Sequence, residues 1–292
     1  MRKVVITRKI PDAGIDFLQE NFDQVTLISE GDFCDRSLLL REIRDAHALL
    51  CLLTENIDKE VMDKAEELKI IANYAVGYNN IDIDYATRRG IYVTNTPDIL
   101  TETTADFAFT LLMAAARRIV EADRFTRAGK FKSWGPELLC GQDIQEKILG
   151  ILGMGRIGTA LARRAALGFN MKILYCDTSV PPGLSFTARK VDLSELLRQS
   201  DFISLHVPLV DTTYHLISEK EISLMKPTAV LINTSRGPVV DEKALIKALQ
   251  QKKIFAAGLD VYEKEPDIPP ELKKLDNVIL APHLGSASVE TR

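Results

Sequence analysis

Three polar segments in the last quarter of the chain carry residues that packing alone does not require. They are INTSRGPVVD (232–241), GLDVYEKEP (258–266) and LAPHLGSAS (280–288). Within them, Arg236, Glu265 and His283 supply a cation, a carboxylate and an imidazole. Such a set could hold a substrate carboxylate, polarise a carbonyl and deliver a proton from a ring that the carboxylate orients. These are the groups that hydride transfer to a small 2-keto acid needs.

Each of these residues also has an ordinary structural interpretation. An arginine after a strand is usually a surface charge, and Glu265 lies in a charged turn. A histidine before Leu-Gly, as in His283, is more often structural than catalytic. The functional interpretation rests on the combination, because each segment follows an apolar run that is expected to be a strand. In open parallel sheets, ligands bind outside the carboxyl ends of the strands, where these segments would meet.

A glycine-rich segment supplies the expected cofactor site. Residues 148–158 read ILGILGMGRIG, in which Gly153, Gly155 and Gly158 form GxGxxG after an apolar run and before a helical pattern. The first glycine permits the tight turn, and the second lets backbone approach a pyrophosphate. The third lets helix and strand pack closely, with the anion at the helix N-terminus. The motif alone is weak evidence, since glycines also cluster in ordinary turns.

Asp177 strengthens that interpretation. It ends the next apolar run, MKILYC (171–176), and lies 19 residues after Gly158. An acidic residue at this position accepts hydrogen bonds from the adenosine ribose and repels a 2′-phosphate. The unit therefore predicts a dinucleotide site that prefers NAD to NADP.

The elements that position these residues follow from hydrophobic periodicity. In the first half, strands are expected at residues 3–7, 25–28, 48–53, 69–73 and 91–94, with helices at 12–21, 35–45, 58–67 and 82–89. A second strand series is expected at residues 148–153, 171–176, 201–207, 229–234, 254–261 and 277–283. An Ala-rich stretch, about Thr101 to Gly129, is predicted to be one helix joining the two series. The alternation predicts an α/β fold of two doubly wound parallel-sheet domains.

Composition excludes several other classes. A chain of 292 residues with 46% hydrophobic and 27% charged residues is long enough for two globular domains. The net charge of −4 disfavours nucleic acid as a partner. We expect neither a signal peptide nor a membrane span, since no apolar run is long enough to cross a bilayer. The four cysteines show no metal-ligand spacing, so we expect no metal, and a reducing cytoplasm suits them best.

Together these segments resemble the D-isomer-specific 2-hydroxyacid dehydrogenases. NTSRGPVVDE, GLDVYEKEP and APHLGSAS are similar to the signature segments of that family, and LGILGMGRIG is similar to its cofactor loop. NYAVGYNNID (73–82) and GIYVTNTPDILTETTADFAFTLL (90–112) most resemble the glyoxylate and hydroxypyruvate reductases. The resemblance implies NAD as the cofactor and a small 2-keto or 2-hydroxy acid as the substrate.

The resemblance also implies a role for individual residues. Arg236 would bind substrate, Glu265 would orient the histidine, and His283 would be the acid–base group. The implied substrate contacts are Leu53, Val76, Gly77, Arg236 and His283. The implied cofactor contacts are Thr104, Gly153, Gly155, Arg156, Ile157, Gly158, Asp177, Val207, Pro208, Thr234, Ser235, Asp260 and Gly285.

The family architecture further implies the domain plan. Residues 1–98 would form a flavodoxin-like substrate domain, and residues 99–283 a Rossmann NAD-binding domain. Residues 284–292 would begin the C-terminal return to the first domain, which the family normally completes with a further helix. Trp134 and its neighbours resemble the arm that crosses to a second subunit in the family, so we expect a homodimer.

Two alternatives remain open from the sequence. The substrate could be D-3-phosphoglycerate or D-lactate, since little in the first-domain loops separates 2-hydroxy acids. The second alternative is an NAD(H)-sensing corepressor-like binding protein. Such relatives keep a similar triad, so the motifs alone do not exclude it. Turnover of glyoxylate or hydroxypyruvate would decide against the second alternative.

Overall fold

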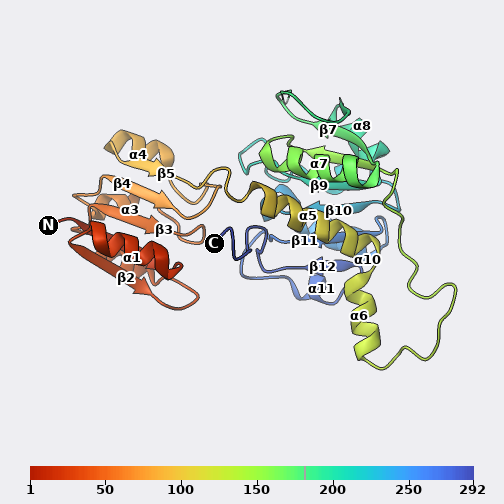
Figure 1. Ribbon diagram of the computed structural model, residues 1–292, viewed down its shortest axis with the longest axis horizontal. Helices are drawn as coiled ribbons and strands as arrows, with labels where there is room; N and C mark the ends of the chain where they lie inside the picture. Colours follow the sequence, from red (N-terminus) through yellow and green to blue (C-terminus); the bar gives the residue numbers. More distant parts are fainter. Residues whose placement is uncertain (181) are drawn as a thin grey trace. The chain divides into compact units, whose positions relative to one another are not determined.

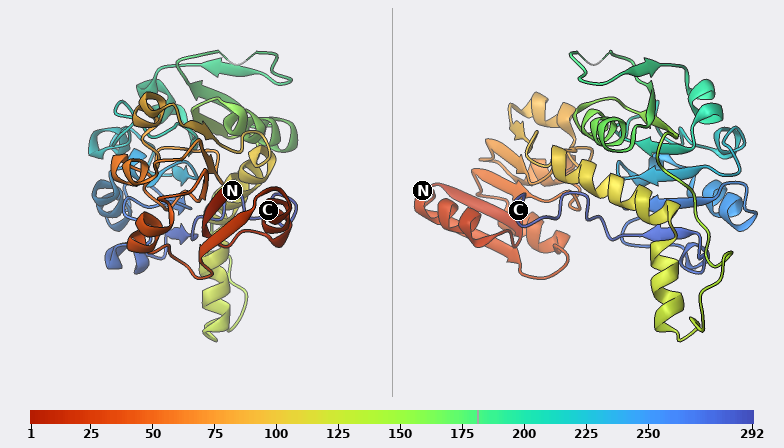
Figure 2. Two further views of the ribbon diagram at one scale, coloured as in Figure 1. Left: turned by 90° about the vertical axis from the view of Figure 1, so that its left-hand side faces the viewer. Right: turned by 45° about the vertical axis from the view of Figure 1, so that its right-hand side comes forward.

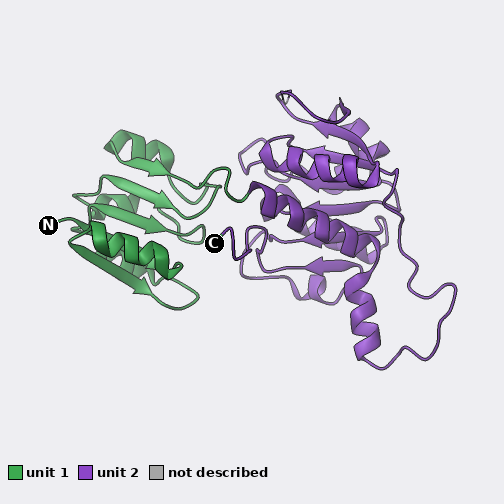
Figure 3. Cartoon of the chain, viewed as in Figure 1, with its two compact units in different colours: residues 1–100, 292 green, residues 101–291 purple. Residues whose placement is uncertain are grey.

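The computed structural model describes residues 1–180 and 182–292. The chain forms two compact units, unit 1 with Met1–Leu100 and Arg292, and unit 2 with Thr101–Thr291 (Figure 3). Residues 284–291, expected to begin a return to the first domain, lie in unit 2. The completed return stays a prediction. Each unit is a parallel sheet flanked by helices, which confirms the predicted α/β class.

Unit 1 contains one five-stranded parallel sheet with the strand order β2-β1-β3-β4-β5 (Figure 1). Its strands are β1 (Lys3–Arg8), β2 (Gln24–Ser29), β3 (Ala48–Cys51), β4 (Ile70–Asn73) and β5 (Tyr92–Thr94). Its helices are α1 (Asp12–Asn21), α2 (Arg36–Glu42), α3 (Lys59–Lys64) and α4 (Ile83–Arg89). This is the flavodoxin-like order that was expected for the first domain.

Side-chain capping explains where most helices of unit 1 begin. The carboxylates of Asp35, Asp58 and Asp82 accept hydrogen bonds from backbone N–H groups in the first turns of α2, α3 and α4. Gly90 ends α4 in the left-handed conformation, with φ of 68°. Because each cap fixes the residue at which a helix begins, it also fixes the length of the loop between the preceding strand and that helix.

Unit 2 contains a seven-stranded parallel sheet with the order β12-β11-β10-β9-β6-β7-β8. Its strands are β6 (Ile148–Leu152), β7 (Lys172–Cys176), β8 (Ala188–Lys190), β9 (Phe202–Leu205), β10 (Val230–Asn233), β11 (Ala256–Leu259) and β12 (Val278–Leu280). Its helices are α5 (Thr101–Ala116), α6 (Ile119–Arg127), α7 (Arg156–Phe169), α8 (Leu193–Gln199), α9 (Glu219–Ile222), α10 (Glu242–Gln250) and α11 (Pro270–Lys273), with a 3-10 turn η1 (Gly237–Val239). The strand order reverses direction at β6 and β9, as in a Rossmann fold.

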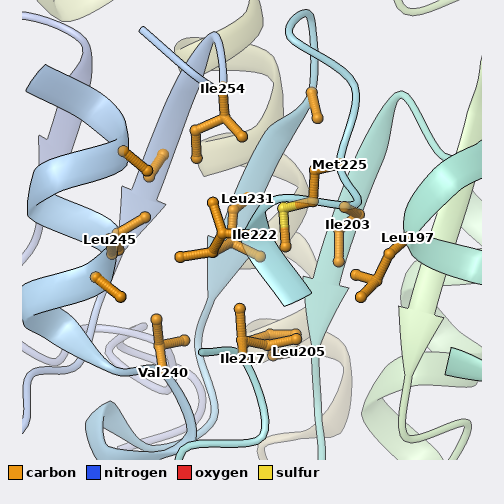
Figure 4. Close-up of a cluster of buried hydrophobic side chains, with 14 of the residues drawn as sticks. Leu197, Ile203, Leu205, Ile217, Ile222, Met225, Leu231, Val240, Leu245 and Ile254 are labelled. Atoms are coloured by element: carbon orange, nitrogen blue, oxygen red, sulfur yellow. The ribbon is translucent and has the colours of Figure 1, made fainter. Parts of the chain in front are cut away.

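Two apolar cores stabilise unit 2, one on each face of the sheet. Helices α5 and α7 pack over one face, where Leu112, Leu149 and Leu161 are buried. Helices α8, α9 and α10 cover the other face, and Figure 4 shows the side chains that meet there, including Leu205 and Leu231. Burial on both faces explains why these strands are continuous apolar runs without alternation.

The single connecting helix predicted for residues 101–129 is wrong, because the structure breaks it into α5 and α6. Arg118 adopts a left-handed conformation with φ of 54°. The carbonyl of Ala116 accepts the N–H of Gln142 at 2.8 Å and does not continue the helix. Gly141 lies against the same carbonyl, where an added Cβ would be 2.3 Å from the oxygen. A contact 25 residues downstream therefore overrides the local helix propensity.

Helix α6 and the extended segment after it project from the body of unit 2 (Figure 2). The segment runs through residues 128–147 and exposes Phe131, Trp134 and Leu138. The short edge strand β8 was not predicted. Among the residues described, no helix is both long enough and apolar enough to cross a bilayer.

Candidate active site

The glycine loop of unit 2 forms a tight turn between β6 and α7. Gly153 has φ of 90°, and a Cβ there would lie 2.7 Å from the backbone of His206. A Cβ on Gly158 would lie 2.2 Å from the carbonyl oxygen of Gly153, so helix and turn pack without room for a side chain. A Cβ on Gly155 would meet nothing within 4 Å. Gly155 therefore leaves open space at the start of α7, where a phosphate can approach backbone.

The residues around that space suit a dinucleotide. Gly155 caps α7 and provides no side-chain hydrogen bond to the first turn, which begins with Arg156 and Ile157. The start of a 14-residue helix attracts anions through these amides. The hydroxyl Oγ1 of Thr234 is buried and has no hydrogen-bond partner among residues 1–180 and 182–292. A buried unpaired hydroxyl suits a polar ligand group at this edge of the sheet.

Asp177 lies directly after β7 and beside the glycine loop. Its carboxylate accepts the N–H groups of Met154 at 2.7 Å and Ser179 at 2.8 Å. Burial would raise the pKa of Asp177, but these backbone hydrogen bonds outweigh it and leave the pKa lowered. The carboxylate is therefore charged at neutral pH, which suits ribose hydroxyls and opposes a 2′-phosphate.

His283 and Glu265 form the central contact of the candidate site. The ring Nδ1 of His283 lies 2.8 Å from Oε2 of Glu265. The other carboxylate oxygen of Glu265 accepts the N–H of Tyr262 at 3.0 Å. Burial would raise the pKa of Glu265, yet the hydrogen bond and charge of His283 prevail, and its pKa is lowered. An ionised carboxylate thus holds one ring nitrogen and fixes the orientation of the imidazole.

Arg236 follows β10 and is placed by a close backbone crossing. A Cβ on Gly237 would lie 1.9 Å from the backbone of Tyr262, so only glycine lets these two loops meet. Burial lowers the pKa of Arg236, and the charge of Glu265 opposes that shift. Nη1 of Arg236 donates to the carbonyl of Ser235 at 2.7 Å. The structure thus brings Arg236 and Glu265 into one electrostatic environment.

Asp260 organises the segment that carries His283. Its carboxylate accepts the N–H groups of Leu284 at 2.6 Å and Gly285 at 2.7 Å, and its carbonyl accepts the N–H of His283. These contacts hold His283 at φ of 59°, an uncommon conformation for a residue with a side chain. Burial raises the pKa of Asp260, opposed by the two N–H bonds. A Cβ on Gly285 would lie 3.4 Å from Thr104, so this predicted cofactor residue lies beside the same segment.

The remaining predicted cofactor residues also lie at the carboxyl edge of the sheet. Val207 and Pro208 follow β9, and the N–H of Val207 lies against Gly153. Ser235 is held by Asn233, whose side-chain oxygen accepts both its N–H and its hydroxyl. His206, which matches no family catalytic position, is hydrogen-bonded to Ser204, and burial lowers its pKa to about 4. A neutral, structural His206 follows.

The predicted substrate residues of unit 1 lie in two neighbouring loops after β3 and β4. Leu53 follows Leu52, whose N–H donates to the buried carboxylate of Glu55 at 2.7 Å. Val76 and Gly77 lie in the loop after β4. Asn80 ties the two loops together, because its side-chain amide donates to the carbonyls of Leu52 and Glu55.

Sequence reasoning missed several residues that support the site. Tyr262 is buried, and its hydroxyl donates to the carbonyl of Ala281 at 2.9 Å, joining the Glu265 and His283 segments. Burial raises the pKa of this phenol, which keeps it protonated. His215 pairs with Glu263 at 2.7 Å beside the same loop. Tyr262 and Glu263 lie within GLDVYEKEP, so their positions could have signalled a role, whereas their partners Ala281 and His215 come from other segments.

Comparison with known proteins gives a consistent result. The sequence profile described as D-isomer specific 2-hydroxyacid dehydrogenase, NAD binding domain, matches residues 109–285. The glyoxylate reductase of Thermococcus litoralis is 55% identical over 296 residues, covering 99% of this chain and 89% of that protein. A crystal structure from Thermus thermophilus is similar with a TM-score of 0.93 at 43% identity, covering 99% of this chain and 92% of the other. An NADPH-dependent glyoxylate/hydroxypyruvate reductase from Sinorhizobium meliloti, crystallised with NADP and malonate, has a TM-score of 0.89 at 35% identity, covering 99% and 88%.

Proposed function

The chain belongs to the D-isomer-specific 2-hydroxyacid dehydrogenase family, and we propose that it reduces glyoxylate or hydroxypyruvate to the 2-hydroxy acid with NADH. The observation that carries the proposal is the contact of His283 with Glu265, beside the loop of Arg236. These residues supply a proton donor, its orienting carboxylate and a fixed cation. The name of the Thermococcus litoralis relative, a glyoxylate reductase, supports the same substrate class.

His283 is the proposed acid–base residue. Glu265 holds Nδ1, so Nε2 is the ring nitrogen that gives its proton to the keto oxygen. The carbonyl carbon gains the hydride and the oxygen gains this proton, which leaves a neutral imidazole that solvent reprotonates. The ionised Glu265 keeps the ring in this orientation through the hydrogen bond at Nδ1.

Arg236 and the Val76–Gly77 loop are the proposed anion-binding groups. The guanidinium of Arg236 is planar and always charged, so it can contact a carboxylate oxygen and the keto oxygen together. In unit 1, the N–H groups of Val76 and Gly77 would bind the substrate carboxylate, with Leu53 forming an apolar contact.

The cofactor is NAD(H), in keeping with the family and with the charged carboxylate of Asp177. When bound, NADH supplies the hydride. The amides at the start of α7 would hold its pyrophosphate, and Asp177 its ribose. Thr104, Thr234, Asp260 and Gly285 would lie toward the nicotinamide end.

Initial-rate kinetics test this function directly. Glyoxylate, hydroxypyruvate, pyruvate and phosphohydroxypyruvate are compared, each with NADH and with NADPH. We expect the highest kcat/KM for one of the first two acids with NADH. A preference for phosphohydroxypyruvate or pyruvate would reassign the substrate, and negligible turnover of all four would reject the enzymatic proposal.

We further propose that the enzyme is a cytoplasmic homodimer. Phe131, Trp134 and Leu138 are exposed on the projecting segment, with Trp134 80% exposed. Large apolar side chains on a projecting segment are typical of a surface that a second subunit covers. The four cysteines are unpaired, which suits a reducing compartment. Sedimentation of the wild-type chain and a Trp134→Ser variant tests the dimer, and a monomeric wild type would contradict it.

A further inference from the structure

The loop after β4 has three consecutive carbonyl groups that the protein itself binds. The carbonyl of Ala75 accepts the backbone N–H of Thr96 at 3.0 Å. The carbonyl of Val76 accepts Nδ2 of Asn95 at 2.9 Å. The carbonyl of Gly77 accepts Nδ2 of Asn73 at 2.8 Å. The carbonyls of Ala75, Val76 and Gly77 are thus directed toward donors on β4 or just beyond β5.

Fixing these carbonyls also fixes the N–H groups that follow them. A peptide bond is planar and trans, so the carbonyl of one residue and the N–H of the next point in opposite directions. Thr96 therefore aims the N–H of Val76, and Asn95 aims the N–H of Gly77. Neither of these N–H groups donates to a backbone carbonyl within the described parts of the chain. Two adjacent donors are held outward and available to an anion.

We propose that Asn95 is a positioning residue for the substrate carboxylate. It acts through the carbonyl of Val76, whose peptide presents the N–H of Gly77 to the anion. The inference rests on the proposed function, because it assumes that the Val76–Gly77 amides bind the acid. It adds a residue outside that loop, contributed by the segment directly after β5.

The choice of Asn95 over its neighbours follows from their contacts. Asn73 also contacts Asn80 and the thiol of Cys51, so replacing it disturbs the neighbouring loop as well. Thr96 acts through its backbone N–H, which only proline would remove. The side chain of Asn95 is half-buried, and its one hydrogen bond described here goes to Val76. Replacing Asn95 with alanine therefore removes the hydrogen bond to the Val76–Gly77 peptide and disturbs few other contacts.

The sequence offers a selective probe of this peptide. Val76–Gly77 is the only Val-Gly pair in the 292 residues. Labelling the full chain with carbonyl-¹³C valine and ¹⁵N glycine therefore gives one carbonyl-to-nitrogen correlated NMR peak. Its ¹³C shift reports the hydrogen bond that Val76 accepts, and its ¹H shift reports the hydrogen bond that Gly77 donates.

The experiment titrates oxamate, an unreactive 2-keto acid analogue, into the NADH-bound protein. In the wild type, the Gly77 proton should move downfield as oxamate binds. In Asn95→Ala, the Val76 carbonyl signal should move upfield before any ligand is added, and the oxamate Kd should rise about tenfold, the loss expected for one charge-assisted hydrogen bond. Asn21→Ala is the matched control, because Nδ2 of Asn21 also donates to a backbone carbonyl, that of Phe17 at 2.8 Å, on α1.

The outcomes separate this inference from the proposed function. A wild-type Gly77 signal that ignores oxamate, or an Asn95→Ala protein that responds like the wild type, overturns the inference. If Asn95 is needed only for stability, the Asn95→Ala substitution would lower the melting temperature and leave the response of the Gly77 signal to oxamate intact. Failure of the proposed function appears elsewhere, as an absence of NADH oxidation with glyoxylate, because the NMR measurement needs no turnover.

Discussion

The imidazole Nδ1 of His283 lies 2.8 Å from the Oε2 of Glu265, although 18 residues separate them in the chain. Three contacts produce this pairing. Asp260 binds the backbone after His283, Tyr262 donates its N–H to Glu265, and the Tyr262 hydroxyl reaches the carbonyl of Ala281. The pair is thus held by groups in the segments that directly follow β11 and β12, so its geometry depends on the folded edge of the sheet.

Removing the imidazole should reduce the chemical step. His283→Ala is expected to lower kcat for glyoxylate reduction by about 10²- to 10⁴-fold, the usual contribution of general acid–base catalysis. NADH binding, followed by nucleotide fluorescence, should change little. His47→Ala is the control, because His47 lies in unit 1 and contacts the backbone N–H of Lys3. Equal kcat values for the two variants would remove His283 from the chemistry.

Replacing Arg236 should affect substrate binding and catalysis together. A guanidinium that contacts both the carboxylate and the keto oxygen stabilises ground state and transition state alike. Arg236→Ala is therefore expected to raise KM for glyoxylate and lower kcat, and Arg236→Lys should restore only part of either, since an ammonium lacks the planar fork. Steady-state kinetics measure both parameters. A change in KM alone would restrict Arg236 to carboxylate binding.

Adding one methyl group to the glycine loop should block the cofactor without unfolding the protein. In Gly155→Ala, the new Cβ meets no protein atom within 4 Å, so the melting temperature should hold. NADH Kd should rise about tenfold or more, because the methyl occupies the space for the pyrophosphate. Gly168→Ala is the matched control on α7, where a Cβ also meets nothing within 4 Å and helix propensity improves. Unchanged NADH affinity in Gly155→Ala would place the nucleotide elsewhere.

Removing the charge of Asp177 should relax cofactor choice. Asp177→Asn keeps an acceptor for the N–H of Met154 or Ser179 but no longer repels a 2′-phosphate. The ratio of kcat/KM for NADPH to that for NADH should therefore rise, by about tenfold if one close charge interaction is lost. The comparison is informative because the similar reductase from Sinorhizobium meliloti is NADPH-dependent. A ratio that stays constant would assign selectivity to other residues.

Much of this architecture could be predicted because it depends on local patterns. The strands around Leu152, Leu205 and Leu231 are buried on both faces, so they appear as continuous apolar runs. The glycine loop could be placed because the GxGxxG spacing of Gly153, Gly155 and Gly158, directly after an apolar run, is a local pattern in the sequence. The alternation of strands and helices indicated a parallel sheet, so the polar residues after β10, β11 and β12 were expected to meet at one edge.

The features that escaped prediction depend on distant contacts. The break between α5 and α6 at Arg118 is set by Gln142 and Gly141, which local helix propensity does not register. Asn95 follows a short edge strand, and its partner Val76 lies 19 residues away. Tyr262 donates its N–H to Glu265 and its hydroxyl to Ala281, two partners that its residue type does not indicate. Such partners become visible only when the fold brings them together.

The pH dependence of reduction by Glu265→Gln tests the central claim most directly. Glu265 is ionised at neutral pH, because burial would raise its pKa but the hydrogen bond and charge of His283 prevail and lower it. Protonation of Glu265 would remove the charge that orients the ring, so wild-type kcat/KM for glyoxylate should hold as pH falls until the pH is below the usual carboxylate range. Glutamine lacks the charge at every pH, so kcat/KM of Glu265→Gln should be reduced at neutral pH and should lack that fall on the acid side. A Glu265→Gln profile that overlays the wild type would contradict the account.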